Sequence, residues 1–357
     1  MKKNEIQQII GQFFEPDEVD EVKPFGTGHI NDTYLVTVAG RYCILQKVNK
    51  AVFNTQALVH NYDILNRSVE VYQKEKGVPL TPQMLKTLEG QYHFIDEEGA
   101  AWRKVEFLPE SKSYDITTDT HISFTTAEAY GKFQLFLNTL DVGSFQDTIP
   151  QFHHPANRMK QFETALKNAP KALSEKAAPE IGQVEKFRPV EREITRLLNS
   201  GKLPRRLSHY DTKLNNVIFH EGYPYVIDLD TVMPGTVLFD FGDMVRTFTS
   251  PAAEDEVDID KTVFRLDHFK ALTKGYLAIL SSTLTAIEKQ NLLLGAKAII
   301  YEQVLRFLAD YLNGNIYYKT AYPEHNLVRC RTQLKLLEEI VKNEGHAIQI
   351  INDVVNL

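Results

Sequence analysis

The sequence has few of the residues that mark secreted or membrane-bound proteins. It contains only two cysteines, Cys43 and Cys330, which are too few and too far apart for a disulfide framework or a metal knuckle. No stretch approaches the roughly 18 consecutive apolar residues of a membrane span, and the first residues lack the apolar core of a signal peptide. These absences favour a soluble, unexported protein of the reducing cytoplasm.

An excess of basic charge is also absent. The 40 Lys and Arg residues are outnumbered by 47 Asp and Glu, which leaves a net charge of -7 and no basic surface for nucleic acid or an anionic membrane. We therefore expect a small-molecule substrate, with no nucleic acid or membrane bound and no protein partner implied. The 357 residues, 43% of them hydrophobic, can bury a large core and are expected to form two domains or lobes.

The most informative segment follows His209. It reads H-x-D-x-x-x-x-N, the form of a kinase catalytic loop, in which the Asp accepts the proton of the acceptor hydroxyl and the Asn holds Mg²⁺. Asp211 and Asn216 occupy these positions. Lys213 follows the base by two residues, where its ammonium could neutralise charge on a transferring γ-phosphate. The segment predicts phosphoryl transfer from ATP with Mg²⁺, with Asp211 and Lys213 as catalytic residues.

A second metal carboxylate is expected at the end of the next hairpin. Residues 217–219 and 225–227 read as strands that are joined by a turn at 221–222. The hairpin delivers Asp228 to the position of the second Mg²⁺ ligand of a kinase. Asp230 faces the same side as Asp228 and could bind either metal or substrate.

The two segments at 209–216 and 226–235 carry a resemblance to a known family. They resemble the catalytic core of the aminoglycoside phosphotransferase-like kinases, which share the bilobal protein-kinase fold. Within that superfamily their sequence is similar to the N-acetylhexosamine 1-kinase branch. The resemblance implies an α+β fold, with a small antiparallel-sheet lobe at 1–107 and a large, mainly helical lobe at 108–357. It also implies an ATP- and Mg²⁺-dependent kinase that phosphorylates the anomeric hydroxyl of N-acetylglucosamine or N-acetylgalactosamine.

The N-terminal part contains a glycine-rich turn before a β-branched strand. Backbone N–H groups of such a turn can approach phosphates because glycine has no Cβ. Asn31 stands where the kinase form has its third glycine. We therefore expect the backbone to contribute less to phosphate binding, and the side chains of Asn31, Asp32 and Thr33 to contribute more. The hinge that would bind adenine is expected at 106–108. We expect the nucleotide to be bound by Gly26, Gly28, Thr33, Lys47, Glu106 and Leu108.

The phosphate-binding cation is expected on the strand at 41–49. Because side chains alternate along a strand, Gln46 and Lys47 cannot both face the nucleotide, and the family's basic position could align with either. Lys47 is the chemical choice. The helix around 57–66 should offer a glutamate to pair with that lysine, but it contains none, so the partner stays unassigned.

Beyond the hinge the pattern becomes helical. Apolar residues recur at helical spacing around 127–140, 157–168, 185–199, 261–283, 286–312 and 327–343. Asp240 and Asp243 resemble the acidic pair that holds the catalytic loop in this superfamily, through hydrogen bonds to the backbone and to His209. The acidic run at 253–258 is expected as a solvated loop, and His153 and His154 are expected at the surface.

The acceptor residues are assigned by the resemblance. The family's sugar-binding Arg and Tyr match Arg306 and Tyr317, and its histidine in the glycine-rich turn matches His29. Asp230 is the fourth residue assigned to the substrate. Without the resemblance, the tyrosines around 311–318 would be interpreted as aromatic residues of the core and its rim.

Two other interpretations stay open. The acceptor could be choline, homoserine, methylthioribose or an aminoglycoside; the tyrosines could build the aromatic cage that choline needs, but Arg306 opposes a quaternary ammonium group nearby. The chain could instead be a non-catalytic pseudokinase, which the irregular glycine turn and the missing glutamate favour. The complete set of Asp211, Lys213, Asn216 and Asp228 opposes that interpretation.

Overall fold

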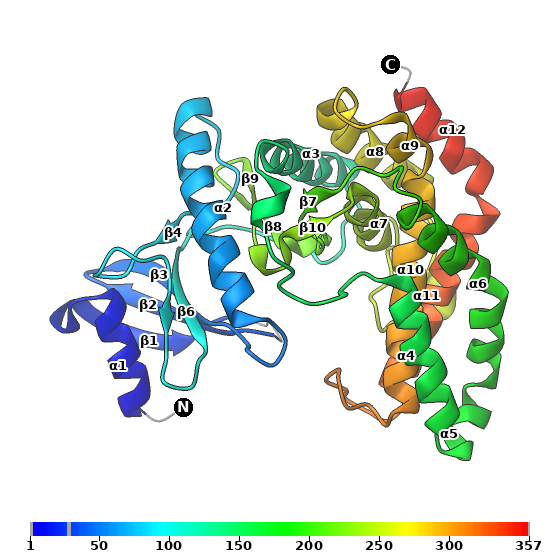
Figure 1. Cartoon of the computed structure of the whole chain (residues 1–357), viewed down its shortest axis with the longest axis horizontal. Coiled ribbons are helices and arrows are strands. Elements are labelled where there is room, and N and C mark those ends of the chain that lie inside the picture. The colour runs from blue at the N-terminus through cyan, green and yellow to red at the C-terminus, as the bar shows by residue number, and fades with distance from the viewer. Residues whose placement is uncertain (1–2, 27–29, 356–357) are drawn as a thin grey trace. The chain divides into compact units, whose positions relative to one another are not determined.

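The computed structural model describes residues 3–26 and 30–355, which form two compact units (Figure 1). The first unit contains the residues up to 112 together with 136–150 and 218–234, and the second contains the rest. The first has a small antiparallel sheet and the second is mainly helical, which confirms the predicted α+β class. The lobe division expected after residue 107 stays a prediction.

The sheet of the first unit has six antiparallel strands. They are β1 Val19–Pro24, β2 Asp32–Val38, β3 Arg41–Lys47, β4 Met84–Leu85, β5 Phe94–Ile95 and β6 Ala101–Glu106. Their order is β1-β2-β3-β6-β4, and β5 pairs with β6. Thr33 lies opposite Gln46 and Gln46 lies opposite Arg103, so these three side chains share one face of the sheet.

The other face of the sheet is covered by α1, Lys3–Phe13. Apolar side chains of the helix and the strands form a buried cluster there, with Ile9, Ile10, Phe13, Phe14, Val36, Cys43, Leu45 and Trp102. The predicted helix at 57–66 is confirmed as α2, Thr55–Lys76. It begins after Asn54, whose side chain accepts a hydrogen bond from the Ala57 N–H, and it ends at Gly77 in the left-handed conformation.

The predicted hairpin before Asp228 is confirmed. Its strands are β8 Val217–His220 and β9 Tyr223–Val226. Glu221 and Gly222 both have positive φ, 49° and 84°, as a two-residue turn between twisted strands requires. Asp228 also has a positive φ of 62° and immediately precedes a short 3-10 helix, η4 Leu229–Thr231.

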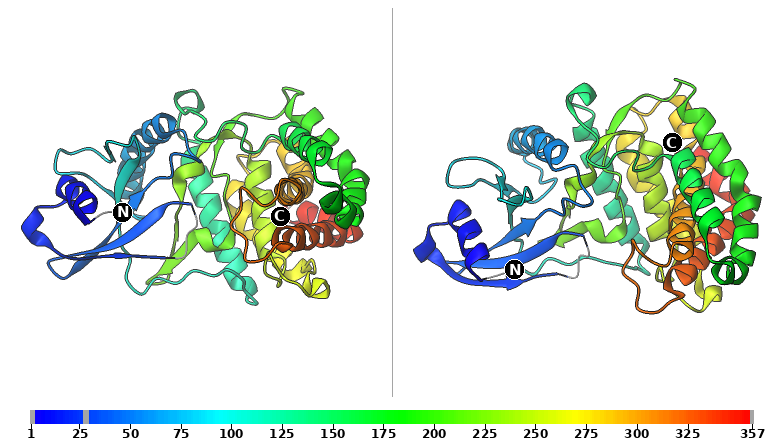
Figure 2. Two further views of the ribbon diagram at one scale, coloured as in Figure 1. Left: turned by 90° about the horizontal axis from the view of Figure 1, so that it is seen from below. Right: turned by 60° about the horizontal axis from the view of Figure 1, so that its bottom comes forward.

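The second unit is built around one buried helix, α10. The helices of this unit are α3 Thr120–Leu137, α4 Pro155–Asn168, α5 Lys171–Lys176, α6 Ala178–Leu198, α7 Val237–Phe248, α8 Leu266–Leu280, α9 Ala286–Gln290, α10 Leu292–Leu312, α11 His325–Lys342 and α12 Glu344–Val355. Nearly every residue of α10 is buried, because α4, α6, α7 and α11 pack against it (Figure 2). Helices are confirmed in all six stretches predicted from periodicity. The stretch at 286–312 is divided into α9 and α10, and α5, α7 and α12 are additions.

Two glycines bring α7 close to α10. A Cβ at Gly242 would lie 2.6 Å from the carbonyl oxygen of Gly295, and a Cβ at Gly295 would overlap the carbonyl of Leu238. The close packing fixes α7, whose polar side chains reach the catalytic segment.

Cys43 and Cys330 are free and buried, the first in β3 and the second in α11. They lie in different units. Among the described residues, no helix has the length and apolar character needed to cross a membrane.

Candidate functional site

The loop that carries Asp211 is held by α7. The Asp240 carboxylate accepts hydrogen bonds from the backbone N–H groups of His209, at 2.9 Å, and Tyr210, at 2.8 Å. Thr212 Oγ1 donates to the Asp240 carbonyl oxygen at 2.6 Å. Tyr210 has a φ of 65°, which is uncommon for a bulky residue, so these bonds hold a backbone conformation that is unfavourable by itself. The predicted role of Asp240 is confirmed.

The structure brings the three polar residues of the loop together at the Asp211 carboxylate. Asp211 Oδ2 accepts hydrogen bonds from Lys213 Nζ and Asn216 Nδ2, both at 2.8 Å. Burial raises the pKa of Asp211, but Lys213, His209 and Arg246 outweigh it and hold the pKa below its usual value. Asp211 is therefore an ionised carboxylate at neutral pH, as a general base must be.

Lys213 and Asn216 are positioned for different tasks. Tyr130 Oη donates to the Lys213 carbonyl oxygen at 2.7 Å and so fixes the backbone from which the ammonium projects. Asn216 uses its amide nitrogen for Asp211, which leaves its amide oxygen to face a cation. An amide oxygen and a carboxylate, such as that of Asp228, are ligands of the type that Mg²⁺ prefers, and their joint binding of the metal stays a prediction.

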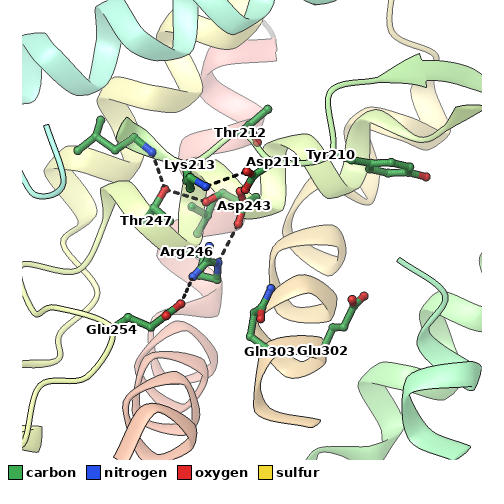
Figure 3. Close-up of polar contacts among 12 residues, drawn as sticks. Tyr210, Asp211, Thr212, Lys213, Asp243, Arg246, Thr247, Glu254, Glu302 and Gln303 are labelled. Atoms are coloured by element: carbon green, nitrogen blue, oxygen red, sulfur yellow. Dashed lines mark hydrogen bonds and ion pairs between the residues drawn. The ribbon is translucent and has the colours of Figure 1, made fainter. Parts of the chain in front are cut away.

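Arg246 is a site residue that the sequence did not reveal. It projects from α7 between two carboxylates, with Nε 2.8 Å from Asp243 Oδ1 and Nη1 2.9 Å from Glu254 Oε1 (Figure 3). Its charge contributes to the lowered pKa of Asp211. Asp243 therefore supports the site through Arg246, and the acidic run that contains Glu254 is fastened to the site by an ion pair.

Arg306 lies on α10 between two aromatic rings. Its guanidinium carbon is 5.6 Å from the ring centroids of both Phe152 and Tyr318. Nη1 donates a long hydrogen bond of 3.4 Å to Gln303 Oε1. Glu302 acts on the guanidinium electrostatically, but no carboxylate among the described residues forms an ion pair with it. The planar fork of N–H donors is thus oriented by stacking and keeps donors for a ligand.

The surface location expected for His153 and His154 is confirmed for His154, which is exposed, and is wrong for His153. Its side chain is only 5% exposed, with Nδ1 3.0 Å from Glu302 Oε1 and Nε2 3.0 Å from the Tyr210 carbonyl oxygen. Arg158 Nε lies 3.3 Å from the same Glu302 oxygen. Glu302 belongs to α10, one turn before Arg306, so this buried polar group links the catalytic loop to the helix of the predicted acceptor site. No local sequence pattern predicts this group, because its members are far apart along the chain.

Tyr317 lies in the loop that follows α10. Asp310 holds this loop, because its carboxylate accepts hydrogen bonds from the N–H groups of Tyr317, at 2.8 Å, and of Ile316 and Tyr318, at 3.0 Å each. The Tyr317 ring is 62% exposed and stands edge-on to Tyr318, with centroids 4.8 Å apart. An exposed ring on a fixed loop is suited to contact with a ligand.

Asp230 is bound inside the first unit. Its Oδ1 accepts hydrogen bonds from Arg103 Nη1, at 2.5 Å, and from the Tyr62 hydroxyl, and its Oδ2 accepts one from Asn31 Nδ2 at 2.7 Å. The residue is 1% exposed. Asp228, two positions earlier, lies close enough to Arg103 to interact with it electrostatically.

The two candidate positions on β3 face opposite ways. Lys47 Nζ lies 3.2 Å from Asp96 and 3.0 Å from Glu98, on the sheet face that α1 covers. Gln46 faces the other side, where its Nε2 donates to Thr33 Oγ1 at 3.0 Å. Thr33 and Gln46 are therefore joined, and Lys47 is separated from both by the sheet.

The other predicted nucleotide residues lie in the turn and at the end of β6. Gly26 has a φ of 80°, which explains a glycine at this point of the turn. The Glu106 N–H donates to the Gln83 carbonyl oxygen at 2.8 Å, and Leu108 is buried. Two predicted residues lie outside the part of the chain that the structure describes: Gly28 and His29.

Comparison with known proteins gives a family match. Residues 21–266 match the model of a family described as the phosphotransferase enzyme family. This range contains the sheet of the first unit and the catalytic segment.

Similar solved structures share the fold. A microcompartment-associated aminopropanol kinase has a TM-score of 0.68 at 14% identity, covering 96% of this chain and 99% of its own. The amicoumacin kinase hAmiN in complex with AMP-PNP, Ca²⁺ and Ami has a TM-score of 0.60 at 13% identity, with coverages of 94% and 93%. A choline kinase from Cryptosporidium parvum Iowa II has a TM-score of 0.56 at 14% identity, with 100% of both chains covered.

Proposed function

Because this chain belongs to the phosphotransferase enzyme family, we propose that it transfers the γ-phosphoryl group of ATP to the anomeric hydroxyl of an N-acetylhexosamine. The acceptors are N-acetylglucosamine and N-acetylgalactosamine, and the products are ADP and the sugar 1-phosphate. The solved structure with AMP-PNP and a divalent cation supports the nucleotide and the metal. The observation that carries the choice of a sugar is the environment of Arg306.

The catalytic steps use the residues around Asp211. The ionised carboxylate orients the anomeric hydroxyl and accepts its proton as the oxygen attacks the γ-phosphorus and the bond to ADP breaks. The ammonium of Lys213, which donates a hydrogen bond to this carboxylate, stabilises the negative charge on the transferring phosphoryl group. Asn216 and Asp228 would hold Mg²⁺, which would supply positive charge to neutralise the phosphates. Positioning supplies most of the rate, since no covalent enzyme intermediate is required.

The nucleotide is assigned to the first unit. Gly26, Gly28 and Thr33 would bind the phosphates, and Glu106 and Leu108 would bind adenine. These assignments rest on the order of the elements along the chain, which is the order of a kinase small lobe, and on the positive φ of Gly26.

The acceptor is assigned to residues of the second unit, with His29 of the glycine-rich turn as a further contact. Arg306 donates hydrogen bonds to hydroxyl or acetamide oxygens, and Tyr317 presents an exposed aromatic face to C–H groups of the sugar. A cationic acceptor is opposed here, because a fixed guanidinium that lacks a carboxylate partner repels it. This argues against choline or an amino alcohol, although fold neighbours named for such acceptors keep them as the second candidate.

The test is an acceptor panel. ADP release would be measured with N-acetylglucosamine, N-acetylgalactosamine, choline, 1-amino-2-propanol and homoserine. We expect the N-acetylhexosamines to have the highest kcat/KM and the Arg306→Met variant to raise their KM roughly 10- to 100-fold, as the loss of a hydrogen bond to a charged group predicts.

The matched control is Arg188→Met, which removes an arginine of α6 that forms ion pairs with Glu163 and Glu185. It should leave the KM for the sugar unchanged. Higher kcat/KM for choline or the amino alcohol would contradict the sugar assignment while keeping the chemistry. If no acceptor stimulated ADP release, the kinase assignment itself would be wrong.

A further inference from the structure

Two of the cationic side chains on neighbouring strands of the first unit's sheet, Lys47 and Arg103, lie in different surroundings. Lys47 of β3 and Arg103 of β6 lie on opposite faces, because Lys47 is paired with Trp102 in the sheet and Arg103 with Gln46. The Lys47 ammonium is held between Asp96 and Glu98 and lies 5.6 Å from the centroid of the Trp102 ring. Its charge is thus balanced on the α1 side of the sheet.

Arg103 is held on the other face by contacts to three elements. Its Nε donates to Gln46 Oε1 of β3 at 2.8 Å, and its Nη1 donates to Asp230 Oδ1 at 2.5 Å. Its guanidinium carbon lies 4.7 Å from the centroid of the Tyr62 ring on α2. Burial lowers the pKa of Arg103 to about 10, so the side chain remains a cation at neutral pH.

Asp230 anchors this arrangement. Besides Arg103 it binds the hydroxyl of Tyr62 and the amide of Asn31, the residue that replaces the third glycine of the turn. Thr148 Oγ1 holds the Asp230 carbonyl oxygen at 2.7 Å. The carboxylate therefore ties α2, the glycine-rich turn and β6 to the segment that carries the predicted metal ligand.

A protein kinase achieves the same connections with a strand lysine and a glutamate on the following helix. Here the strand position on the Arg103 face is Gln46, and the helix offers Tyr62 in place of a glutamate. In this chain the cation is on the neighbouring strand, β6, and the carboxylate is that of Asp230 and not of a helix residue. A guanidinium has more N–H donors than these two hydrogen bonds use, and its planar fork suits phosphate oxygens.

We propose that Arg103, not Lys47, is the cation of the first unit that binds the nucleotide phosphates, with Asp230, Tyr62 and Gln46 as the residues that position it. The inference rests on the proposed kinase function and replaces the assignment of Lys47. It needs no particular acceptor, so it can be tested by nucleotide binding alone.

The first measurement is the dissociation constant of MgADP for the full chain, by isothermal titration calorimetry. Arg103→Met is expected to raise it roughly 10- to 100-fold, the effect of losing a charge-assisted hydrogen bond. Lys104→Met is the matched control, since Lys104 is the next residue of β6 and binds the Phe13 carbonyl oxygen on the α1 side. It should bind MgADP as the wild type does. A larger increase for Lys47→Met than for Arg103→Met would overturn the proposal.

The second measurement moves the charge back to β3. Gln46→Lys in the Arg103→Met background places an ammonium directly across the strand pair from the lost guanidinium. It should restore most of the affinity for MgADP, whereas a merely structural Arg103 predicts no recovery. If Arg103→Met changes the unfolding temperature but leaves MgADP binding intact, the proposal is also wrong.

A variant that keeps Arg103 covers the case in which Arg103→Met does not fold. Tyr62→Phe removes one hydrogen bond to Asp230 and should raise the KM for ATP roughly 3- to 10-fold at unchanged KM for the sugar. An unchanged KM for ATP would contradict the positioning role. MgADP binding without sugar phosphorylation would contradict the proposed acceptor and leave this inference standing.

Discussion

At the scale of single residues, the base Asp211 has to stay ionised although the protein partly desolvates it. Three basic side chains surround the carboxylate, and Lys213 makes the shortest contact, at 2.8 Å. Lys213 thus has two tasks, because the ammonium that stabilises the transferring phosphoryl group also keeps the base deprotonated before the substrates bind.

Removing Lys213 should therefore change both the rate and its pH dependence. In the wild type the pKa of Asp211 is below the usual aspartate value, so the base stays ionised from neutral pH into the acidic range where an ordinary aspartate would be protonated. In Lys213→Met, burial remains while the largest opposing charge is gone, so the pKa rises. The acid limb of kcat/KM should shift to higher pH, and kcat should fall roughly 10²- to 10³-fold.

This result would be measured as a pH profile of kcat/KM for wild type and variant. Asn215→Ala is a suitable control, because Asn215 lies in the same loop and its side chain binds the partly exposed Asp115. An acid limb at the same pH in Lys213→Met and wild type would show that Lys213 does not set the ionisation of the base.

The distance of contacts along the chain decided which residues could be predicted. Asp211, Lys213 and Asn216 lie within one short loop, and their spacing alone brought them together. The pairing of Arg103 with Asp230 depends on the register of β3 with β6 and on the position of the turn after β9. No local pattern encodes that register. The sequence therefore favoured Lys47 only because a lysine side chain is a cation.

Among the helices, periodicity found six stretches and missed α5, α7 and α12, of which α7 carries residues of the site. In α7, polar residues recur at helical spacing, but every residue from Val237 to Val245 is buried, so the polar side of the helix faces other parts of the protein and not solvent. This is the helix that carries Asp240, Asp243 and Arg246. The polar residues are buried because they bind the catalytic loop and one another, and their apolar neighbours pack against α10.

The contact between α7 and α10 should tolerate no added methyl group. Gly295→Ala would push a Cβ into the Leu238 carbonyl, so we expect the free energy of unfolding to fall by about 1–3 kcal/mol, together with a loss of kcat as α7 shifts. Gly182→Ala is the control, because nothing lies within 4 Å of a Cβ at this helical position. It should be neutral or stabilise the protein by up to about 1 kcal/mol. Equal stability of both variants in urea titrations would contradict the close packing.

At the scale of the whole molecule, each unit contains one buried thiol. Burial raises the pKa of Cys43 in the first unit to about 11, and burial also raises the pKa of Cys330 in the second. A buried thiol that is not ionised does not react with disulfide reagents until its surroundings open. Single-cysteine variants therefore report the opening of each unit separately.

We expect neither thiol to react in the native protein at neutral pH and both to react in denaturant. MgADP should slow the labelling of Cys43, because ligand binding stabilises the unit that holds the nucleotide residues. The measurement is the rate of thiol labelling with and without nucleotide, with MgAMP as a control for binding through the base alone. Rapid labelling of either cysteine in native buffer would contradict its burial.

The family, the α+β fold and the order of the catalytic parts could all be predicted from the sequence, because the residues of the catalytic segment are close together along the chain. The acceptor could not be predicted in this way. Arg306, Phe152 and His153 come together only through the packing of α10, and their chemistry depends on which partners surround the guanidinium.

The most direct test of the account is ³¹P NMR of the reaction products formed from ATP, Mg²⁺ and N-acetylglucosamine or N-acetylgalactosamine. We expect a sugar phosphate resonance coupled to the anomeric proton, formed by the wild type and absent with Asp211→Asn, although that variant still folds and binds MgADP. A phosphate on any other hydroxyl, or product formation by Asp211→Asn at the wild-type rate, would contradict it.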